Sequence, residues 1–122
     1  MTVIEEQTQN EIMKLQRLSI VRLCSPEVVP PDSPDDERIQ AEHIAYLTGL
    51  RDKGIIALNG PVRFKDSPKF RGMSIYTVDA DEARTYALQD PAVKAGWFEV
   101  VVDGWWLPSI PVTVGDRVDI EI

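Results

Sequence analysis

His43 is the residue of this chain best suited to proton chemistry, and it is the only histidine. It stands in a stretch predicted to be helical, residues 38–53, where apolar or aromatic residues recur at spacings of three and four. These residues are Ile39, Tyr46, Leu47 and Leu50. The spacing puts the imidazole on the inward face of a helix. Histidine side chains in such surroundings are suited to proton transfer, because their unperturbed pKa is about 6.5. Periodicity alone favours the alternative, a histidine that is hydrogen-bonded within the core.

A second candidate for function is the segment of residues 62–71, VRFKDSPKFR, which is basic in a chain of net charge −7. It carries a single acid, Asp66, against Arg63, Lys65, Lys69 and Arg71. One interpretation is a rim or lid near Gly60 and Pro61 that attracts an anionic substrate. The other, which the usual composition of loops favours, is a solvated hairpin connection.

Other reactive constellations are missing from the sequence. The single Cys24 has no partner for a disulfide, and no Cys/His cluster has the spacing of a zinc site. The chain has no glycine-rich phosphate loop, and no serine or cysteine nucleophile has a base beside it in sequence. We therefore expect neither a metal nor a cofactor.

At 122 residues, with 43% hydrophobic and 27% charged residues, the chain has the composition of a single globular domain, residues 1–122. Its net charge of −7 argues against a nucleic acid or an anionic membrane as the main partner. The N-terminus has no apolar run of signal-peptide length, and no stretch approaches the roughly 18 apolar residues of a membrane span. These observations lead us to expect a cytoplasmic protein.

The elements that must position these residues are predicted in the order strand, helix, strand, strand, helix, strand. Their predicted ranges are 18–23, 34–53, 55–58, 72–78, 80–89 and 97–106. This is the split βαβ pattern of an α+β, ferredoxin-like βαββαβ sandwich, with two helices on one face of a four-stranded antiparallel sheet. Outside this core, residues 1–17 suggest a lead-in helix, and residues 107–122 suggest a tail with a late edge strand.

Helix ends are the most legible local signals. Ser33 is predicted to cap the first helix, with Pro34 at its first position and Gly54 in the left-handed position after its end. The second helix should begin at Asp79, which has capping-box spacing to Glu82. Asn59, Gly60 and Pro61 are the residues predicted to turn the chain after the second strand.

Both faces of the predicted sheet are apolar. Phe98, Val100, Val102 and Trp106 alternate with Trp97, Val101 and Trp105 along the last strand, and Ile55 and Ala57 are expected to oppose Ile56 and Leu58. Two helices cover only one face, and a monomer rarely leaves an apolar sheet face in water. We therefore expect a homodimer that forms through the other face, across a two-fold axis.

With this order of elements and the helical histidine, residues 18–106 resemble the YCII-related (YciI-like) domain family. The matching segments are AEHIAYLTGLRDKGII, NGPV, RGMSIYTVDADEA and QDPAVKAGWFEVVV. The DP-x-V-x-AG element together with the histidine is the specific part of this match, whereas the Gly-Pro turn alone is weak. The resemblance implies the fold of the dimeric α/β barrels, which include muconolactone isomerase-type enzymes.

The resemblance also implies a catalytic pair of His43 and Asp90, the family's histidine and DP aspartate. A carboxylate that accepts from one imidazole nitrogen fixes the tautomer and leaves the other nitrogen to move a substrate proton. The alternative role for Asp90 is to cap a further single helical turn, which Pro91 opens and Gly96 ends. Both roles are compatible, because a carboxylate has two oxygens.

Five further residues complete the predicted substrate-binding set: Ser74, Tyr46, Gly60, Pro61 and Arg63. In the family's arrangement Ser74 lies beside the dyad, although a buried serine bonded to the backbone is an equal alternative. Tyr46 follows His43 by one helical turn, and an aromatic residue at such a position is more often plain core.

Together these features predict a cofactor-independent lyase or isomerase that uses a His–Asp dyad on a small-molecule substrate. An aromatic or polyketide-like substrate is implied only by the family, one member of which is a dehydrochlorinase of a chlorinated hydroxyquinol. The substrate itself does not carry over, because the motif fixes the dyad and leaves the rest of the pocket free. The alternatives are a non-catalytic small-molecule-binding or accessory module, and a structural dimer partner of a larger enzyme.

Overall fold

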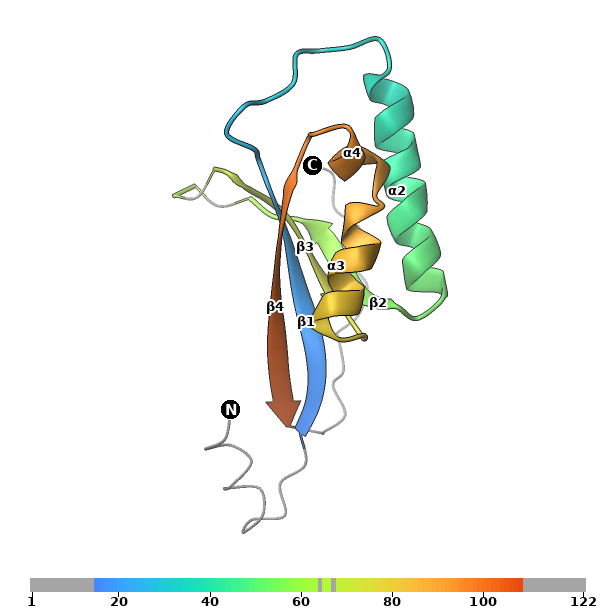
Figure 1. Cartoon of the computed structure of the whole chain (residues 1–122), viewed down its shortest axis with the longest axis vertical. Helices are drawn as coiled ribbons and strands as arrows, with labels where there is room; N and C mark the ends of the chain where they lie inside the picture. Colours follow the sequence, from blue (N-terminus) through green and yellow to red (C-terminus); the bar gives the residue numbers. More distant parts are fainter. Residues whose placement is uncertain (1–14, 64, 67, 109–122) are drawn as a thin grey trace. The chain divides into compact units, whose positions relative to one another are not determined.

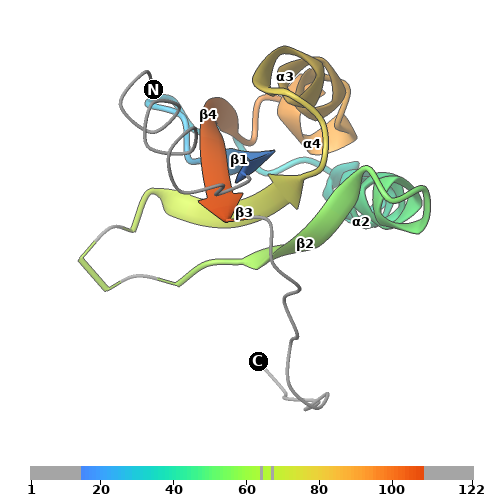
Figure 2. The ribbon, with the colours of Figure 1, turned by 90° about the horizontal axis from the view of Figure 1, so that it is seen from below.

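The computed structural model describes residues 15–63, 65–66 and 68–108. Its elements are β1 (Leu15–Cys24), α2 (Asp36–Asp52), β2 (Ile56–Pro61), β3 (Phe70–Tyr76), α3 (Ala80–Leu88), α4 (Pro91–Lys94) and β4 (Glu99–Pro108). The strands form one antiparallel sheet in the order β2-β3-β1-β4, and the helices lie on one side of it (Figures 1 and 2). The predicted ferredoxin-like α+β sandwich is therefore confirmed.

The core lies between the helices and the central strands of the sheet. β1 supplies Val21 and Leu23 to it, and α2 supplies Leu50. On α3 the core residues are Ala83 and Ala87, which are 0% and 3% exposed, so their small side chains let this short helix lie close on the sheet. Apolar burial along these faces holds α2 at a fixed position over the strands.

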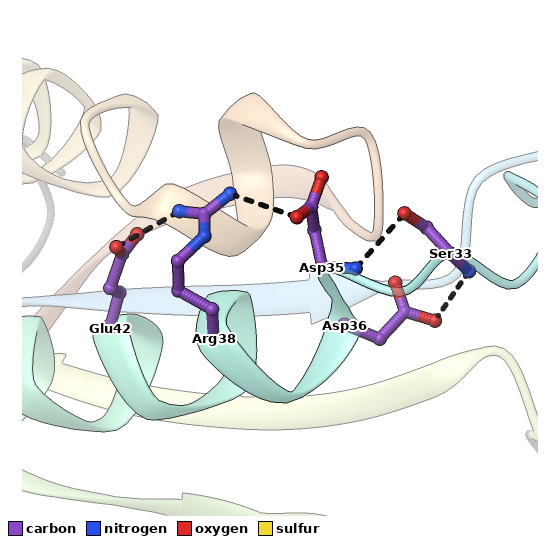
Figure 3. Close-up of polar contacts among 5 residues, drawn as sticks. All are labelled: Ser33, Asp35, Asp36, Arg38 and Glu42. Carbon is purple, nitrogen blue, oxygen red and sulfur yellow. Dashed lines mark hydrogen bonds and ion pairs between the residues drawn. The ribbon is translucent and has the colours of Figure 1, made fainter.

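The start of α2 differs from the prediction. The helix begins at Asp36 with Asp35 as the N-cap, and Ser33 lies two residues earlier. The Ser33 hydroxyl accepts from the Asp35 amide at 3.2 Å, while the Ser33 amide donates to the Asp36 carboxylate at 3.0 Å (Figure 3). Ser33 thus closes a turn ahead of the helix, because its hydroxyl satisfies the amide two residues on.

The remaining predicted helix boundaries are confirmed. Gly54 follows the end of α2 with φ +76°, and Gly96 follows α4 with φ +81°, both in the left-handed region that glycine tolerates. The Asp79 carboxylate accepts from the Glu82 amide at 2.9 Å at the start of α3. The third helix, α4, begins with Pro91 as predicted for the single turn after Asp90.

β2 is longer than predicted and contains a bulge. Asn59, Gly60 and Pro61, predicted to turn the chain, lie within β2 and pair with β3, where Pro61 is tolerated because β2 is an edge strand. The register shifts between Ile56 and Leu58, so these residues lie on opposite faces, with exposures of 1% and 55%. The prediction that they share a face is therefore wrong, because one extra residue reverses the alternation.

The other strand boundaries shift by a few residues. β1 begins at Leu15, so residues 15–17 belong to a strand rather than to the predicted lead-in helix, and residues 1–14 lie outside the described residues. β3 spans Phe70–Tyr76, which places Arg71 in a strand rather than in the connecting loop. β4 runs to Pro108, and the predicted late edge strand lies outside the described residues.

The sheet face away from the helices is partly apolar. Phe98, Val100 and Val102 pack against the core cluster, so alternation along β4 directs Val101 and Trp105 to the opposite side, where they are 37% and 40% exposed. Arg22 and Asp103 form an ion pair at 2.7 Å between β1 and β4. Within the described part of the chain, no helix has the length and apolar character needed to cross a membrane.

Candidate active site

A cavity of about 480 Å³ opens between α2 and the β2–β3 edge of the sheet. Its helical wall is a stripe of residues at spacings of three and four along α2: Gln40, His43, Ile44, Leu47, Thr48 and Arg51. Its other wall comes from the strands and from Phe98. The volume falls within the range of about 300 to 1,000 Å³ typical of small-molecule sites.

His43, which lines this cavity, is in direct contact with Asp90. The His43 Nδ1 atom lies 2.9 Å from Asp90 Oδ1 and 2.7 Å from Asp90 Oδ2. The two side chains are 13% and 2% exposed, so the pair is largely removed from water. A carboxylate can only accept here, which directs the proton of a neutral imidazole to Nδ1 and leaves Nε2 as the basic nitrogen.

Two further contacts fix this pair. Asp90 Oδ1 also accepts from the Ala92 amide at 2.9 Å and so caps α4, which means that the same carboxylate serves the helix and the imidazole. The His43 ring lies against the ring of Phe98, with centroids 5.9 Å apart and planes tilted by 44°. The chemistry-bearing imidazole is therefore held by α2, α4 and the residue that precedes β4.

Two tyrosines lie behind the pair. The Tyr46 hydroxyl donates to the Tyr86 carbonyl at 2.7 Å. Burial raises the pKa of Tyr46, and the nearby Asp90 and Tyr86 raise it further. Burial likewise raises the pKa of Tyr76, which is 1% exposed, with added contributions from Tyr46 and Asp90. Both phenols therefore stay neutral around the carboxylate.

The predicted site residues divide into two groups. His43, Ser74, Gly60 and Pro61 line the cavity, and Asp90 supports His43 from behind. Ser74 is 4% exposed on β3, opposite Asn59 of β2. Tyr46 and Arg63 do not line this cavity. The Tyr46 hydroxyl forms a hydrogen bond with the Tyr86 carbonyl of α3, and Arg63 borders a smaller hollow that Pro61 also lines.

Two polar wall residues were not predicted. Arg51 continues the His43 stripe eight residues on, and Asn59 enters the wall because the bulge in β2 turns it towards the helices. The Arg51 guanidinium donates to Asn59 Oδ1 at 3.2 Å. Extending the helical spacing from His43 would have found Arg51, whereas no local signal indicated Asn59. Arg71, assigned at first to the loop, also lines the cavity.

Among the described residues, no group of three or more histidine, cysteine, aspartate or glutamate side chains is arranged to hold a metal ion. The wall offers a basic nitrogen from His43, the guanidinium groups of Arg51 and Arg71, and apolar surface. This arrangement can bind a small organic molecule and exchange a proton with it.

Comparison with known proteins identified a family and similar solved structures. The sequence model of a family described as "YCII-related domain" matches residues 20–102. A solved structure, the 5-chloro-2-hydroxyhydroquinone dehydrochlorinase from Burkholderia phenoliruptrix AC1100 in complex with 2,5-dihydroxybenzoquinone, superposes with a TM-score of 0.50 at 25% identity. The match covers 72% of this chain and 92% of the dehydrochlorinase. No curated protein sequence matches significantly.

Proposed function

The chain belongs to the YCII-related domain family, and from that premise we propose that it is a small-molecule lyase or isomerase in which His43 transfers protons and Asp90 orients it. The single observation that carries the proposal is the contact of His43 Nδ1 with the Asp90 carboxylate, at 2.7 and 2.9 Å, in the wall of a ligand-sized cavity. A histidine buried only for packing has no need of a cavity at its second nitrogen.

In the proposed reaction the His43 Nε2 atom accepts a proton from a C–H or O–H group of the substrate. The imidazolium that forms is stabilised by the Asp90 carboxylate, which also accepts from the Ala92 amide. Return of the proton to a different substrate atom completes an isomerisation. Departure of a leaving group with its bonding electrons completes an elimination. Positioned acid–base catalysis of this kind contributes about 10² to 10⁴ in rate.

The dehydrochlorinase supports this class of reaction, since its activity is an elimination from a small aromatic molecule and it was solved with 2,5-dihydroxybenzoquinone. The cavity of this chain offers apolar surface from Ile44, Leu47 and Phe98, and a base, His43, in its wall. We therefore propose hydroxylated aromatic or quinone-like molecules as the first compounds to assay.

The test measures proton transfer directly. Wild-type protein should accelerate deuterium exchange at the ring protons of 2,5-dihydroxybenzoquinone in D₂O, followed by NMR, and His43→Ala should reduce that rate by about 10² or more. Glu42→Gln is the matched control, because Glu42 lies on the exposed side of α2 and bonds only Arg38 among the described residues. A folded His43→Ala protein that exchanges at the wild-type rate would contradict the dyad and favour a non-catalytic binding module.

We also propose that the protein is a homodimer that forms through the open face of the sheet. Support comes from Val101, Trp105 and Leu58, apolar residues that are 37%, 40% and 55% exposed on that face. Burial of a Trp side chain in such an interface is a strong source of binding energy. Analytical ultracentrifugation should give about twice the monomer mass, and Val101→Glu should shift the mass to that of a monomer. A wild-type protein that sediments as a monomer at micromolar concentration would refute this part of the proposal.

A further inference from the structure

We infer that Arg51 of α2 and Arg71 of β3 form an anion-binding subsite on two walls of the cavity, and that the ligand is a small organic anion whose charged oxygens lie against these two guanidinium groups. This inference rests on the proposed function, since the same ligand is taken to present its reacting atoms to His43. The subsite adds a requirement that the dyad alone does not impose: the ligand must carry negative charge.

The first observation is that Arg51 is oriented towards the cavity. It lies in the last turn of α2 and lines the cavity wall, and its guanidinium donates to Asn59 Oδ1 at 3.2 Å. An amide oxygen accepts one of the five N–H bonds of the guanidinium without neutralising its charge. Asn59 thus holds the group in place and leaves its other donors available to a ligand.

The second observation is that Arg71 reaches the same cavity from the sheet. It precedes Gly72, whose partner in the ladder is Pro61, and the Arg71 carbonyl accepts from the Val62 amide at 2.9 Å. The backbone position of this residue is therefore fixed by strand pairing. Gly72 is constrained as well, since a Cβ atom there would lie 3.5 Å from the Gly60 carbonyl oxygen.

The third observation concerns charge. None of the described residues that line the cavity is an aspartate or a glutamate, although the chain as a whole has a net charge of −7. Within the described part of the chain, neither Arg51 nor Arg71 forms an ion pair. Asp32 and Asp36 border a neighbouring hollow that Arg71 also lines. Two guanidinium groups without an ion-pair partner among the described residues create a positive potential in the cavity, which attracts an anion before contact and bonds it after contact.

The fourth observation is that the two arginines lie on different walls of the cavity. Arg51 is in the last turn of α2, whereas Arg71 also borders a neighbouring hollow lined by Phe98, whose ring lies against that of His43. A ring that carries acidic oxygens at two separate positions can present one charge to each guanidinium group.

The test is a pair of equilibrium titrations with 2,5-dihydroxybenzoquinone, an acidic compound that is anionic at neutral pH, and its neutral dimethyl ether, 2,5-dimethoxybenzoquinone. Wild-type protein should bind the anion more tightly, and added salt should weaken that binding. Arg51→Gln and Arg71→Gln should each raise the dissociation constant of the anion by about tenfold, as expected for loss of one charged hydrogen bond. Neither change should alter the affinity for the ether.

Two further variants complete the design. Arg84→Gln removes one positive charge from the exposed surface of α3, away from the cavity, and should leave both affinities unchanged. Asn59→Asp keeps the Arg51 guanidinium but places a carboxylate against it, and should weaken anion binding as Arg51→Gln does. Circular dichroism should give the same spectrum for every variant.

Three results would overturn the subsite: no saturable binding of the anion to wild-type protein, equal binding of the two ligands, or arginine variants that lose both ligands equally. These results are separable from failure of the proposed function. His43→Ala should retain the affinity for the anion within about twofold while deuterium exchange falls, because an interaction used only in the transition state leaves ground-state binding intact. Deuterium exchange that persists in His43→Ala would contradict the dyad. The titrations with the arginine variants would still test the subsite in that case.

Discussion

Two groups of residues around the cavity are held differently. His43 and Asp90 are 13% and 2% exposed and are tied by hydrogen bonds to each other and to α4. Arg51 and Arg71 are exposed, and within the described residues their one hydrogen bond to another side chain is that from Arg51 to Asn59. The same cavity thus combines a buried, hydrogen-bonded pair with two exposed cations.

This difference matches two physical tasks. Proton transfer requires a donor and an acceptor held at hydrogen-bond distance, and errors of an ångström are costly. Attraction between charges acts over several ångströms and tolerates the motion of a long side chain. We therefore expect changes at His43 or Asp90 to alter turnover and stability. Changes at Arg51 or Arg71 should alter affinity and its dependence on salt.

The largest effect should come from Asp90→Asn. An asparagine oxygen still accepts from the Ala92 amide, but its NH₂ group then faces His43 Nδ1, which moves the imidazole proton to Nε2 and removes the base. Turnover should fall by about 10² to 10⁴, while thermal unfolding shows only a small loss of stability. The matched control is Asp79→Asn, at the equivalent cap of α3, where the partner is the Glu82 amide and no imidazole is involved. Equal activity of the two variants would contradict the proposed role of Asp90 in orienting the imidazole.

The next effect concerns pH. Burial raises the pKa of Tyr76, so the folded chain retains the phenol proton at pH values where the unfolded chain releases it. The free energy of unfolding should therefore stay constant below about pH 10, the unperturbed tyrosine pKa, and fall as the pH rises above it. Urea unfolding between pH 8 and 11 measures this loss. Tyr76→Phe should flatten the curve, and an unchanged curve would mean that this buried phenol is not what resists ionisation.

A smaller effect is expected from the basic connection between β2 and β3. Arg63 and Lys65 are exposed and lie outside the main cavity, so they can act only through long-range attraction. Arg63→Ala combined with Lys65→Ala should lower kcat/KM by less than about tenfold, the low end of charge steering, and should reduce its dependence on salt. The value of kcat should not change. A lower kcat would instead mean that Arg63 and Lys65 act in the chemical step.

The smallest effect should follow Tyr46→Phe. This change removes the hydrogen bond to the Tyr86 carbonyl and leaves the ring in place. Unfolding in urea should show a loss of about 1 kcal/mol, typical of one neutral hydrogen bond, with kcat unaltered. Tyr86→Phe keeps the backbone carbonyl and serves as the control. A large fall in kcat for Tyr46→Phe would mean that Tyr46 takes part in catalysis together with the His43–Asp90 pair.

Local chemistry predicted much of this fold. Gly54 and Gly96 mark helix ends because only a residue without Cβ easily adopts positive φ, and both do so here. Asp79 and Asp90 mark helix starts because their carboxylates satisfy free amides, and both are bonded as caps. These signals act over a few residues, so one sequence is enough to find them.

Non-local features were harder to predict. His43 and Asp90 are 47 residues apart, and only the resemblance to a family paired them. The sequence Asn59-Gly60-Pro61 is typical of a turn, yet pairing with β3 keeps these residues extended. Arg51 belongs to the periodic stripe of His43, but a charged residue near the end of a helix is typical of a solvent-exposed position. The features that were missed depend on which strand lies beside which helix, and this depends on the whole chain.

The bulge in β2 has a consequence for how this cavity can change over generations. Ordinary substitutions alter the strand wall one residue at a time, and most leave its neighbours as they were. Loss of the single residue Ala57 would leave Ile56, Leu58 and Asn59 opposite Tyr76, Ile75 and Ser74, the partners that they have now, so Asn59 would stay in the cavity wall. A deletion farther along β2, where the pairing is regular, would instead turn the residues that follow it to the other face of the sheet. The bulge therefore gives this strand one residue that it can lose without a change in the lining of the binding site, whereas a codon deletion elsewhere in β2 would replace part of that lining in one event.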